Sequence, residues 1–244
     1  MNTASISRRA RLFRFLFGLV ILSALPLLAG PPAQPIRVAC VGDSITFGSQ
    51  LTNREADSYP VRLGQLLGPL YDVRNFGVSG ATLLSKGNKP YIKQPAHKDA
   101  LAFKPDILII LLGTNDSKHP MDGETNKVPN NWQYKADYRA DYAGLIGEFR
   151  QVNPSVKVYL CYPPPAFSHR YGINNQTIHE EIIPLITKVA GEQRANIIDL
   201  NTTFGTRKDL FFADGIHPNA TGDRVMATAI YIALTGKIPQ TGVL

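Results

Sequence analysis

The sequence contains little cysteine and no motif for nucleotide or zinc binding. The only cysteines among its 244 residues are Cys40 and Cys161, each in a segment whose pattern predicts a buried strand. Two cysteines do not make a disulfide framework, so we expect two buried free thiols rather than a bridge. No Cys/His cluster has zinc-like spacing, and neither a Walker loop nor a Gly-x-Gly-x-x-Gly fingerprint is present. These absences argue against a zinc protein, a P-loop NTPase and a dinucleotide-dependent enzyme.

The basic charge of the chain is concentrated at its beginning. The formal net charge is +7 at pH 7, and the first 30 residues hold four arginines and no acidic residue. Without these arginines, 22 basic residues face 19 acidic ones, a net charge of +3. No dense stripe of lysine and arginine follows, as a nucleic-acid-binding surface would need. We therefore do not expect the protein to bind nucleic acid.

The first 33 residues have the anatomy of an export signal. An arginine-rich start precedes an apolar run over 15–29, and a Gly-Pro-Pro-Ala segment follows over 30–33. The run is shorter than the about 20 residues that span a membrane, although an uncleaved N-terminal anchor stays open. No later apolar run is long enough to cross a membrane. We expect a signal peptide or anchor over 1–33 and one domain over 34–244, exported to the periplasm or secreted.

After residue 33, segments typical of buried strands alternate with amphipathic helices. Strands are expected over 36–41, 71–76, 106–112, 156–162 and 195–200. Helices are expected over 60–67, 92–103, 134–151, 176–194 and 220–234. The third strand is apolar without alternation, as in a parallel strand covered on both faces. The pattern predicts an α/β protein, a three-layer α/β/α domain with a five-stranded, mainly parallel sheet.

Two features of this pattern need comment. Pro184 lies inside the helix expected over 176–194 and should kink or split it. The polar loop from Ser117 to about Gln133 is long for a compact domain, which is typical of functional or mobile loops. The helix after it carries a stripe of large side chains at helical spacing, which we interpret as core.

Polar clusters follow the expected strands at their carboxyl ends, where ligands and catalytic groups gather in open parallel sheets. They contain Ser44 after the first strand, Gly80 after the second, Asn115 after the third, and Asp214 with His217 after the fifth. Each cluster alone is a weak signal. Together they supply every residue type that ester hydrolysis by a serine nucleophile needs.

Each group has a definite chemical task. A serine hydroxyl attacks an ester only when a neighbouring base removes its proton, and the imidazole of His217 can do so near neutral pH. Asp214, three residues earlier, can accept the Nδ1 proton and stabilise the imidazolium. The negative oxygen of the tetrahedral intermediate needs donors. The candidates are the N–H groups of Ser44 and Gly80 and the amide of Asn115.

The same residues also have purely structural interpretations. Asp214 suits a turn or a helix cap, and Asn115 suits an Asx turn. His217 could be an ordinary loop histidine, and Gly80 could serve only the backbone angles of its turn. Gly77 is an alternative to Gly80 as the oxyanion donor.

The chain has no Gly-x-Ser-x-Gly elbow, so the common α/β-hydrolase fold is not expected. It resembles instead the SGNH (GDSL-type) hydrolases, in four blocks that match in order over the chain after the leader. The blocks are Gly-Asp-Ser over 42–44, Asn-Phe-Gly-Val-Ser-Gly over 75–80, Gly-Thr-Asn-Asp over 113–116 and Asp-x-x-His over 214–217.

This resemblance implies a flavodoxin-like sheet and a catalytic triad of Ser44, His217 and Asp214. It also implies an oxyanion hole formed by Ser44, Gly80 and Asn115, with no metal or other cofactor. Asp43, beside the serine, is expected to support the turn.

The four blocks do not name a substrate, because the superfamily includes carbohydrate O-acetylesterases, lysophospholipases, thioesterases and arylesterases. Aromatic and amide side chains in the loops around the site suit a sugar ring, but they also suit an acyl chain or simple packing. The candidate substrate contacts are Tyr59, Asn131, Trp132, Phe167 and Tyr171.

A loose likeness to sialate and xylan O-acetylesterases favours removal of O-acetyl groups from a carbohydrate. The alternatives are a lysophospholipase or thioesterase, and a non-catalytic carbohydrate-binding protein of the same fold. The sequence leaves open the sugar, the acyl-chain length and the oligomeric state.

Overall fold

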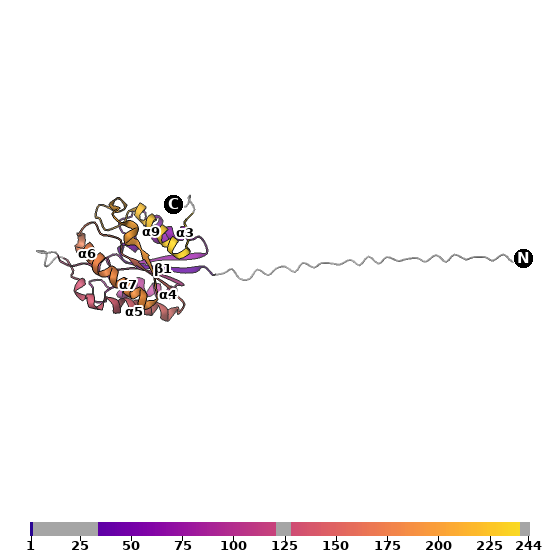
Figure 1. The fold of residues 1–244 in the computed structure, drawn as a ribbon, viewed down its shortest axis with the longest axis horizontal. Helices are drawn as coiled ribbons and strands as arrows, with labels where there is room; N and C mark the ends of the chain where they lie inside the picture. The colour runs from indigo at the N-terminus through magenta and orange to yellow at the C-terminus, as the bar shows by residue number, and fades with distance from the viewer. Residues whose placement is uncertain (2–33, 121–127, 240–244) are drawn as a thin grey trace. The chain divides into compact units, whose positions relative to one another are not determined.

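A sheet of parallel strands forms the centre of the unit Gln34–Leu244 (Figure 1). The strands are β1 (Ile36–Gly42), β2 (Tyr71–Gly77), β3 (Ile107–Leu111), β4 (Lys157–Tyr162) and β5 (Asn196–Asp199). Their order is β2-β1-β3-β4-β5, and every neighbouring pair is parallel. This is the strand order of flavodoxin-like domains. The expected α/β class and five-stranded sheet are confirmed.

The structure is a computed structural model that describes residues 1, 34–120 and 128–239. The leader expected over 1–33 lies, apart from Met1, outside the described residues. Among the described helices, none has the length and apolar character to cross a membrane.

Helices cover both faces of the sheet (Figure 1). One face packs against α3 (Tyr59–Leu67), α8 (Leu200–Phe204) and α9 (Ala220–Thr235). The other packs against α4 (Pro95–Phe103), α5 (Tyr138–Val152) and α7 (Ile183–Gln193). Shorter helices are α1 (Ser44–Phe47), α2 (Arg54–Asp57) and α6 (Asn175–Thr177). Single 3₁₀ turns cover Tyr91–Lys93, Arg170–Gly172 and Lys208–Leu210, and a longer 3₁₀ segment covers Trp132–Asp137.

Side chains of the central strands alternate between the two layers of core, because successive residues of a strand point to opposite faces. In β1, Val38 and Cys40 pack on the α3 and α9 side, whereas Ala39 and Val41 pack on the α4 and α5 side. Cys40 and Cys161 are free and buried, as expected, and burial raises the pKa of the Cys40 thiol to about 12.

The helix that was expected over 176–194 contains a π-helical turn just before Pro184. This turn covers Ile178–Ile182 after α6, and α7 then starts with Pro184 in its first turn. The N–H of Ile183 donates to the carbonyl of Ile178, so the helical backbone continues across the turn. Helix α5 begins at Tyr138 rather than 134, since the backbone of Tyr134 is not helical.

The turn that carries Ser44 rests directly on the end of β2. A Cβ atom added at Gly77 would lie 2.2 Å from the backbone nitrogen of Phe47. A Cβ atom added at Gly42 would lie 2.0 Å from Oγ1 of Thr46. Glycine is therefore required at these strand ends for the close approach of α1, which fixes the position of the serine.

We expect Gly77→Ala to lower the free energy of unfolding by about 2 kcal/mol, because the added methyl forces the backbone of α1 away from β2. Urea denaturation measures this change. The control is Gly144→Ala in α5, where an added Cβ meets no atom within 4 Å. This control should stabilise the protein by about 0.5–1 kcal/mol through higher helix propensity. Equal stability of Gly77→Ala and the wild type would contradict the described contact.

Candidate active site

The predicted site residues gather where the strand order reverses. β1 pairs with β2 on one side and with β3 on the other, so the connections after β1 and β3 diverge at the carboxyl edge. Such a switch point leaves a crevice for ligands. Ser44 follows β1 and Asn115 follows β3 at this place, and the loop with Asp214 and His217 reaches it from beyond β5.

Ser44 is the first residue of α1, and Asp43 caps this helix. One carboxylate oxygen of Asp43 accepts the Ile45 N–H at 2.9 Å, and the other accepts the Asn115 amide at 3.2 Å. Burial raises the pKa of Asp43 to about 7, although these hydrogen bonds act in the opposite direction. Asp43 thus has the supporting place expected for it, and it connects the serine turn to the loop after β3.

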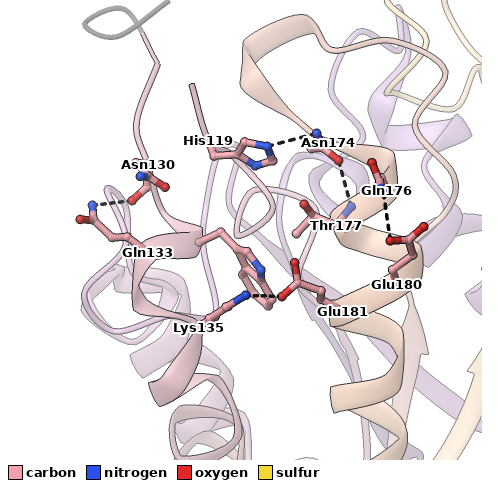
Figure 2. Close-up of a pocket in the computed structure, with 10 residues that line it drawn as sticks. His119, Asn130, Gln133, Lys135, Asn174, Gln176, Thr177, Glu180 and Glu181 are labelled. Carbon is pink, nitrogen blue, oxygen red and sulfur yellow. Dashed lines mark hydrogen bonds and ion pairs between the residues drawn. The ribbon is translucent and has the colours of Figure 1, made fainter. Parts of the chain in front are cut away.

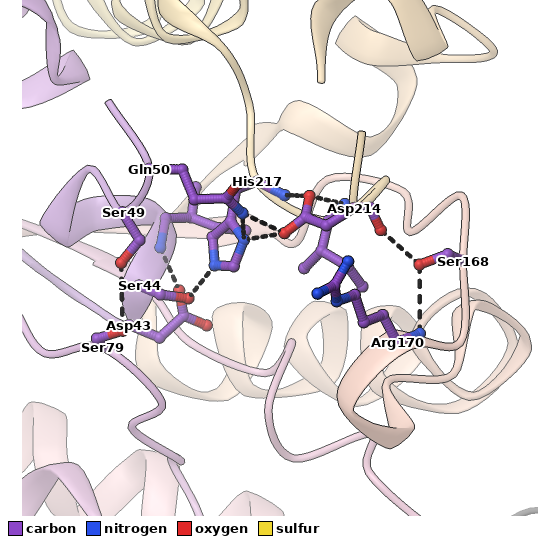
Figure 3. A network of polar contacts seen from close by, with 11 residues as sticks. Asp43, Ser44, Ser49, Gln50, Ser79, Ser168, Arg170, Asp214 and His217 are labelled. Carbon is purple, nitrogen blue, oxygen red and sulfur yellow. Dashed lines mark hydrogen bonds and ion pairs between the residues drawn. The ribbon is translucent and has the colours of Figure 1, made fainter. Parts of the chain in front are cut away.

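Ser44, His217 and Asp214 form a continuous hydrogen-bonded chain (Figure 3). The hydroxyl oxygen of Ser44 lies 2.9 Å from Nε2 of His217. Nδ1 of His217 lies 2.6 Å from Oδ2 of Asp214. All three residues are at least nine-tenths buried. The imidazole is therefore placed between the hydroxyl and the carboxylate, as a general base requires.

The carboxylate of Asp214 is held in its ionised form. Burial alone would raise the pKa of Asp214, but the hydrogen bonds from His217 and from two backbone N–H groups outweigh it and lower the pKa below the usual value. The two N–H groups belong to Ile216 and His217 and donate to Oδ1 at 3.0 and 3.1 Å. The hydroxyl of Ser168 also donates to the carbonyl of Asp214 at 2.5 Å.

Three hydrogen-bond donors near the serine hydroxyl remain available. Among the described residues, the N–H groups of Ser44 and Gly80 donate to no other protein group. Gly80 has φ = +80°, a conformation that favours glycine. Asn115 has two amide protons and uses one on Asp43, so the second is free to bind a ligand. Of the two glycines considered, Gly80 lines the pocket, and Gly77 packs under α1.

A pocket of about 320 Å³ opens over the serine. Most of its lining residues are polar or small, and Tyr171 and Ile173 are the large apolar side chains among the described ones. Lys118 also lines it, and burial lowers the pKa of this lysine. Within residues 34–120 and 128–239, no three His, Cys, Asp or Glu side chains gather closely enough to hold a metal ion.

The candidate substrate contacts fall in different environments. Tyr171 lines the pocket and is 50% exposed. Tyr59 is completely buried, with its hydroxyl 3.0 Å from Oγ1 of Thr46, so its assignment as a substrate contact was wrong. Phe167 packs edge-on against Phe211 at a ring distance of 5.0 Å and does not line the pocket. Packing of the core explains Tyr59 at the start of α3, and packing against Phe211 explains Phe167.

Asn131 and Trp132 are also buried rather than open to the pocket. The Asn131 amide donates to the carbonyl of Asn115 at 2.8 Å and to the side-chain oxygen of Asn88 at 2.8 Å. These contacts fix the loop after β3. Trp132 is 6% exposed and packs edge-on against Tyr138. The structure gives Asn131 supporting contacts, whereas Trp132, although buried away from the serine pocket, lines a second hollow and stays a candidate contact.

A second, more polar hollow of about 420 Å³ lies beside Trp132 (Figure 2). Its lining includes His119 and Asn174, which adjoin Lys118 and Ile173 of the first pocket in the sequence. Lys135 forms an ion pair with Glu181 across it at 2.6 Å. The hollow therefore offers amide and charged groups next to the serine pocket.

Gln50 and Lys118 line the serine pocket, although neither was among the predicted site residues. Gln50 lies in the polar loop after α1, and Lys118 begins the long loop after β3. Neither belongs to a motif, and a glutamine or lysine in a polar loop carries no distinctive signal. Only the folded chain places them at the site.

Comparison with known proteins identifies the family. A model described as the GDSL-like lipase/acylhydrolase family matches residues 40–225. The chain belongs to this family. The match includes all four blocks that carried the resemblance, and the expected family is confirmed.

Two curated relatives of this GDSL-like chain are named as esterases. It is 40% identical over 227 residues to an acetylxylan esterase of Xylanibacter ruminicola, covering 86% of this chain and 45% of the relative. It is 27% identical to a multidomain esterase of Ruminococcus flavefaciens, covering 82% of this chain and 29% of the relative. The chain thus spans less than half the length of these relatives.

Solved structures support the GDSL-like fold. A lipase/acylhydrolase from Enterococcus faecalis matches with a TM-score of 0.62 and 22% identity, over 85% of this chain and 100% of the other. A catalytic mutant of the acetylxylan esterase Axe2 from Geobacillus stearothermophilus matches with a TM-score of 0.64 and 18% identity, over 85% and 98%. At these identities the likeness concerns the fold alone.

We expect Asn115→Ala to lower kcat for a small ester about 100- to 1,000-fold with little change in KM, because the free amide proton would stabilise charge that develops only in the transition state. Steady-state kinetics measure this. The control is Asn196→Ala, an exposed asparagine at the start of β5, which should retain full activity. A kcat loss smaller than about tenfold would contradict the role of Asn115.

Proposed function

We propose that this chain is a serine esterase that hydrolyses carboxylic esters through Ser44, His217 and Asp214. One observation supports this most strongly, the unbroken hydrogen-bonded chain from the Ser44 hydroxyl through the imidazole to the Asp214 carboxylate. Membership of a lipase/acylhydrolase family and the esterase names of the curated relatives agree with it.

The geometry leads to a two-step reaction. Nε2 of His217 takes the proton of Ser44 as the hydroxyl oxygen attacks the ester carbonyl, and Asp214 stabilises the imidazolium that forms. The imidazolium then gives its proton to the leaving alcohol, and an acyl group stays on Ser44. A water molecule, activated by the same imidazole, releases the acid in the second step.

The oxyanion hole of this proposal consists of the three available donors. The N–H groups of Ser44 and Gly80 and the second amide proton of Asn115 would bind the negative oxygen of the tetrahedral intermediate. Because Asp43 and Asn131 hold Asn115 from two sides, its amide is oriented before the substrate arrives. Donors fixed in advance need no reorganisation during the reaction.

We further propose that the acyl group is acetyl and that the alcohol is a carbohydrate. The serine pocket is small and has only two large apolar side chains among the described lining residues, Tyr171 and Ile173, which suits an acetyl group better than a long acyl chain that needs an extended apolar wall. Tyr171 and the polar hollow beside Trp132 offer an aromatic face and hydrogen-bonding groups to a sugar. The curated relative of 40% identity is named as an acetylxylan esterase.

Export of the protein is part of the same proposal. It rests on the arginine-rich start and the apolar run over 15–29. An acetylated plant or microbial polysaccharide is an extracellular substrate, which agrees with an exported enzyme.

Ser44→Ala should reduce the hydrolysis of p-nitrophenyl acetate at least about 1,000-fold, because the variant lacks the attacking oxygen. The release of p-nitrophenol measures the rate, and circular dichroism checks that the variant is folded. Equal rates for the variant and the wild type would contradict the esterase mechanism and favour a non-catalytic binding protein.

The wild type should cleave the acetyl ester faster than octanoyl and palmitoyl esters, because the described pocket is small and has only two large apolar side chains, Tyr171 and Ile173. A comparison of kcat/KM for the three p-nitrophenyl esters measures this preference. Acetate released from acetylated xylo-oligosaccharides then identifies the carbohydrate. A preference for palmitoyl would overturn the acetylesterase proposal in favour of a lysophospholipase or thioesterase.

A further inference from the structure

Gln50 has an unusual backbone conformation close to the triad. It lies six residues after Ser44, in the turn that follows α1, and its φ is 70°. This left-handed region is uncommon for residues other than glycine and asparagine, and costs about 1–2 kcal/mol for a residue with a side chain. Strain of this kind persists only where the surrounding structure holds it, often at functional sites.

The side chain of Gln50 reaches the interface between the acid and the base of the triad (Figure 3). Its amide nitrogen donates to Oδ2 of Asp214 and lies 2.9 Å from Nδ1 of His217. When Nδ1 carries the proton that points to Asp214, it cannot accept a second one. The glutamine proton therefore goes to Oδ2, the same oxygen that binds the imidazole.

This contact connects two separate segments of the chain. The other side-chain and backbone donors to the Asp214 carboxylate in the described residues are His217 and Ile216, both on its own loop. Gln50 comes instead from the segment of the nucleophile. It therefore holds the loop of acid and base against the turn that carries Ser44.

We propose that Gln50 is a positioning residue of the triad, which orients the Asp214 carboxylate and, through it, the imidazole of His217 toward Ser44. This inference rests on the proposed esterase function. The amide of Gln50 lies on the Nδ1 side of the ring, away from the Nε2 atom that meets the serine, so we assign its effect to Asp214 and His217; because its side chain also lines the pocket, a change in kcat without a change in KM is the readout that identifies this role.

Other charged or titratable groups surround the imidazole. Asp214 lies on its own loop, Asp43 lies beside Ser44, and Lys118 lines the pocket from the loop after β3. Arg170 and Tyr171 belong to the loop after β4. Substitutions at Gln50 leave all of these groups in place, so a change in the pH profile would report on the contact of Gln50 itself.

Two variants separate the hydrogen bond from the volume of the side chain. Gln50→Met keeps the length but lacks the donor, and should lower kcat for p-nitrophenyl acetate about tenfold with little change in KM. Gln50→Glu adds a negative charge beside Nδ1, which stabilises the imidazolium. Because the base must be neutral to act, the acid limb of the kcat/KM profile should move to higher pH.

A third variant tests whether Gln50 has only a structural role. Gln50→Gly removes the side chain and also relieves the left-handed backbone. It should raise the urea midpoint of unfolding while losing as much kcat as Gln50→Met. If Gln50→Gly retains the wild-type kcat, the positioning role is wrong.

Gln94→Met is the matched control. Gln94 is a glutamine whose amide donates to a loop carbonyl, here that of Pro90 at 2.9 Å, and it lies outside both described pockets, so the variant should keep the wild-type kcat and pH profile. Wild-type kcat in Gln50→Met together with an unmoved acid limb in Gln50→Glu would overturn the inference.

The failure of the esterase proposal itself would be seen separately. It would appear as hydrolysis that persists in Ser44→Ala, whatever the Gln50 variants do. An NMR titration of His217 in the wild type and Gln50→Glu adds a readout that needs no activity. The imidazole should titrate at higher pH in the variant, and an unchanged titration would contradict the contact.

Discussion

The reversal of strand order between β1 and β3 is the constraint on which the site depends. Parallel strands place all their carboxyl ends at one edge, and the reversal opens that edge between Ser44 and Asn115. The glycines that end β1 and β2 let α1 approach so closely that the serine has little freedom to move. A rigid frame of this kind is what preorganised catalysis needs, since donors and nucleophile must be in place before the substrate binds.

The buried carboxylates around this edge differ in the direction in which the protein shifts their pKa. Asp214 has enough hydrogen-bond donors to overcome burial, so its pKa falls and it stays charged beside the imidazole. Asp43 and Asp116 are buried more completely, and burial raises their pKa to about 7 and about 6. Asp116 accepts the N–H groups of Leu83 and Leu84. Of these three carboxylates, only Asp214, the proposed acid of the triad, has a lowered pKa, whereas the other two hold loops together.

The sequence predicted the strands and the fold class, because these depend on local patterns. Short motifs predicted the three residues that form the hydrogen-bonded chain from Ser44 through His217 to Asp214. It failed for residues whose place depends on loop packing. Tyr59 was assigned to the substrate from its type and position, but it is completely buried. Asn131 supports the loop after β3 rather than lining the pocket. Gln50 belongs to no motif, and only the fold of its turn brings it to Asp214.

The most direct test of the account is to find which residue carries the acyl group. The full chain would be treated with an organophosphate ester such as paraoxon, which forms a stable adduct with an activated serine, and its peptides analysed by mass spectrometry. The account predicts one diethyl phosphate adduct, on Ser44, formed together with loss of esterase activity and absent from Asp214→Asn or His217→Ala within the same time. An active protein whose adduct lies on another residue would contradict it.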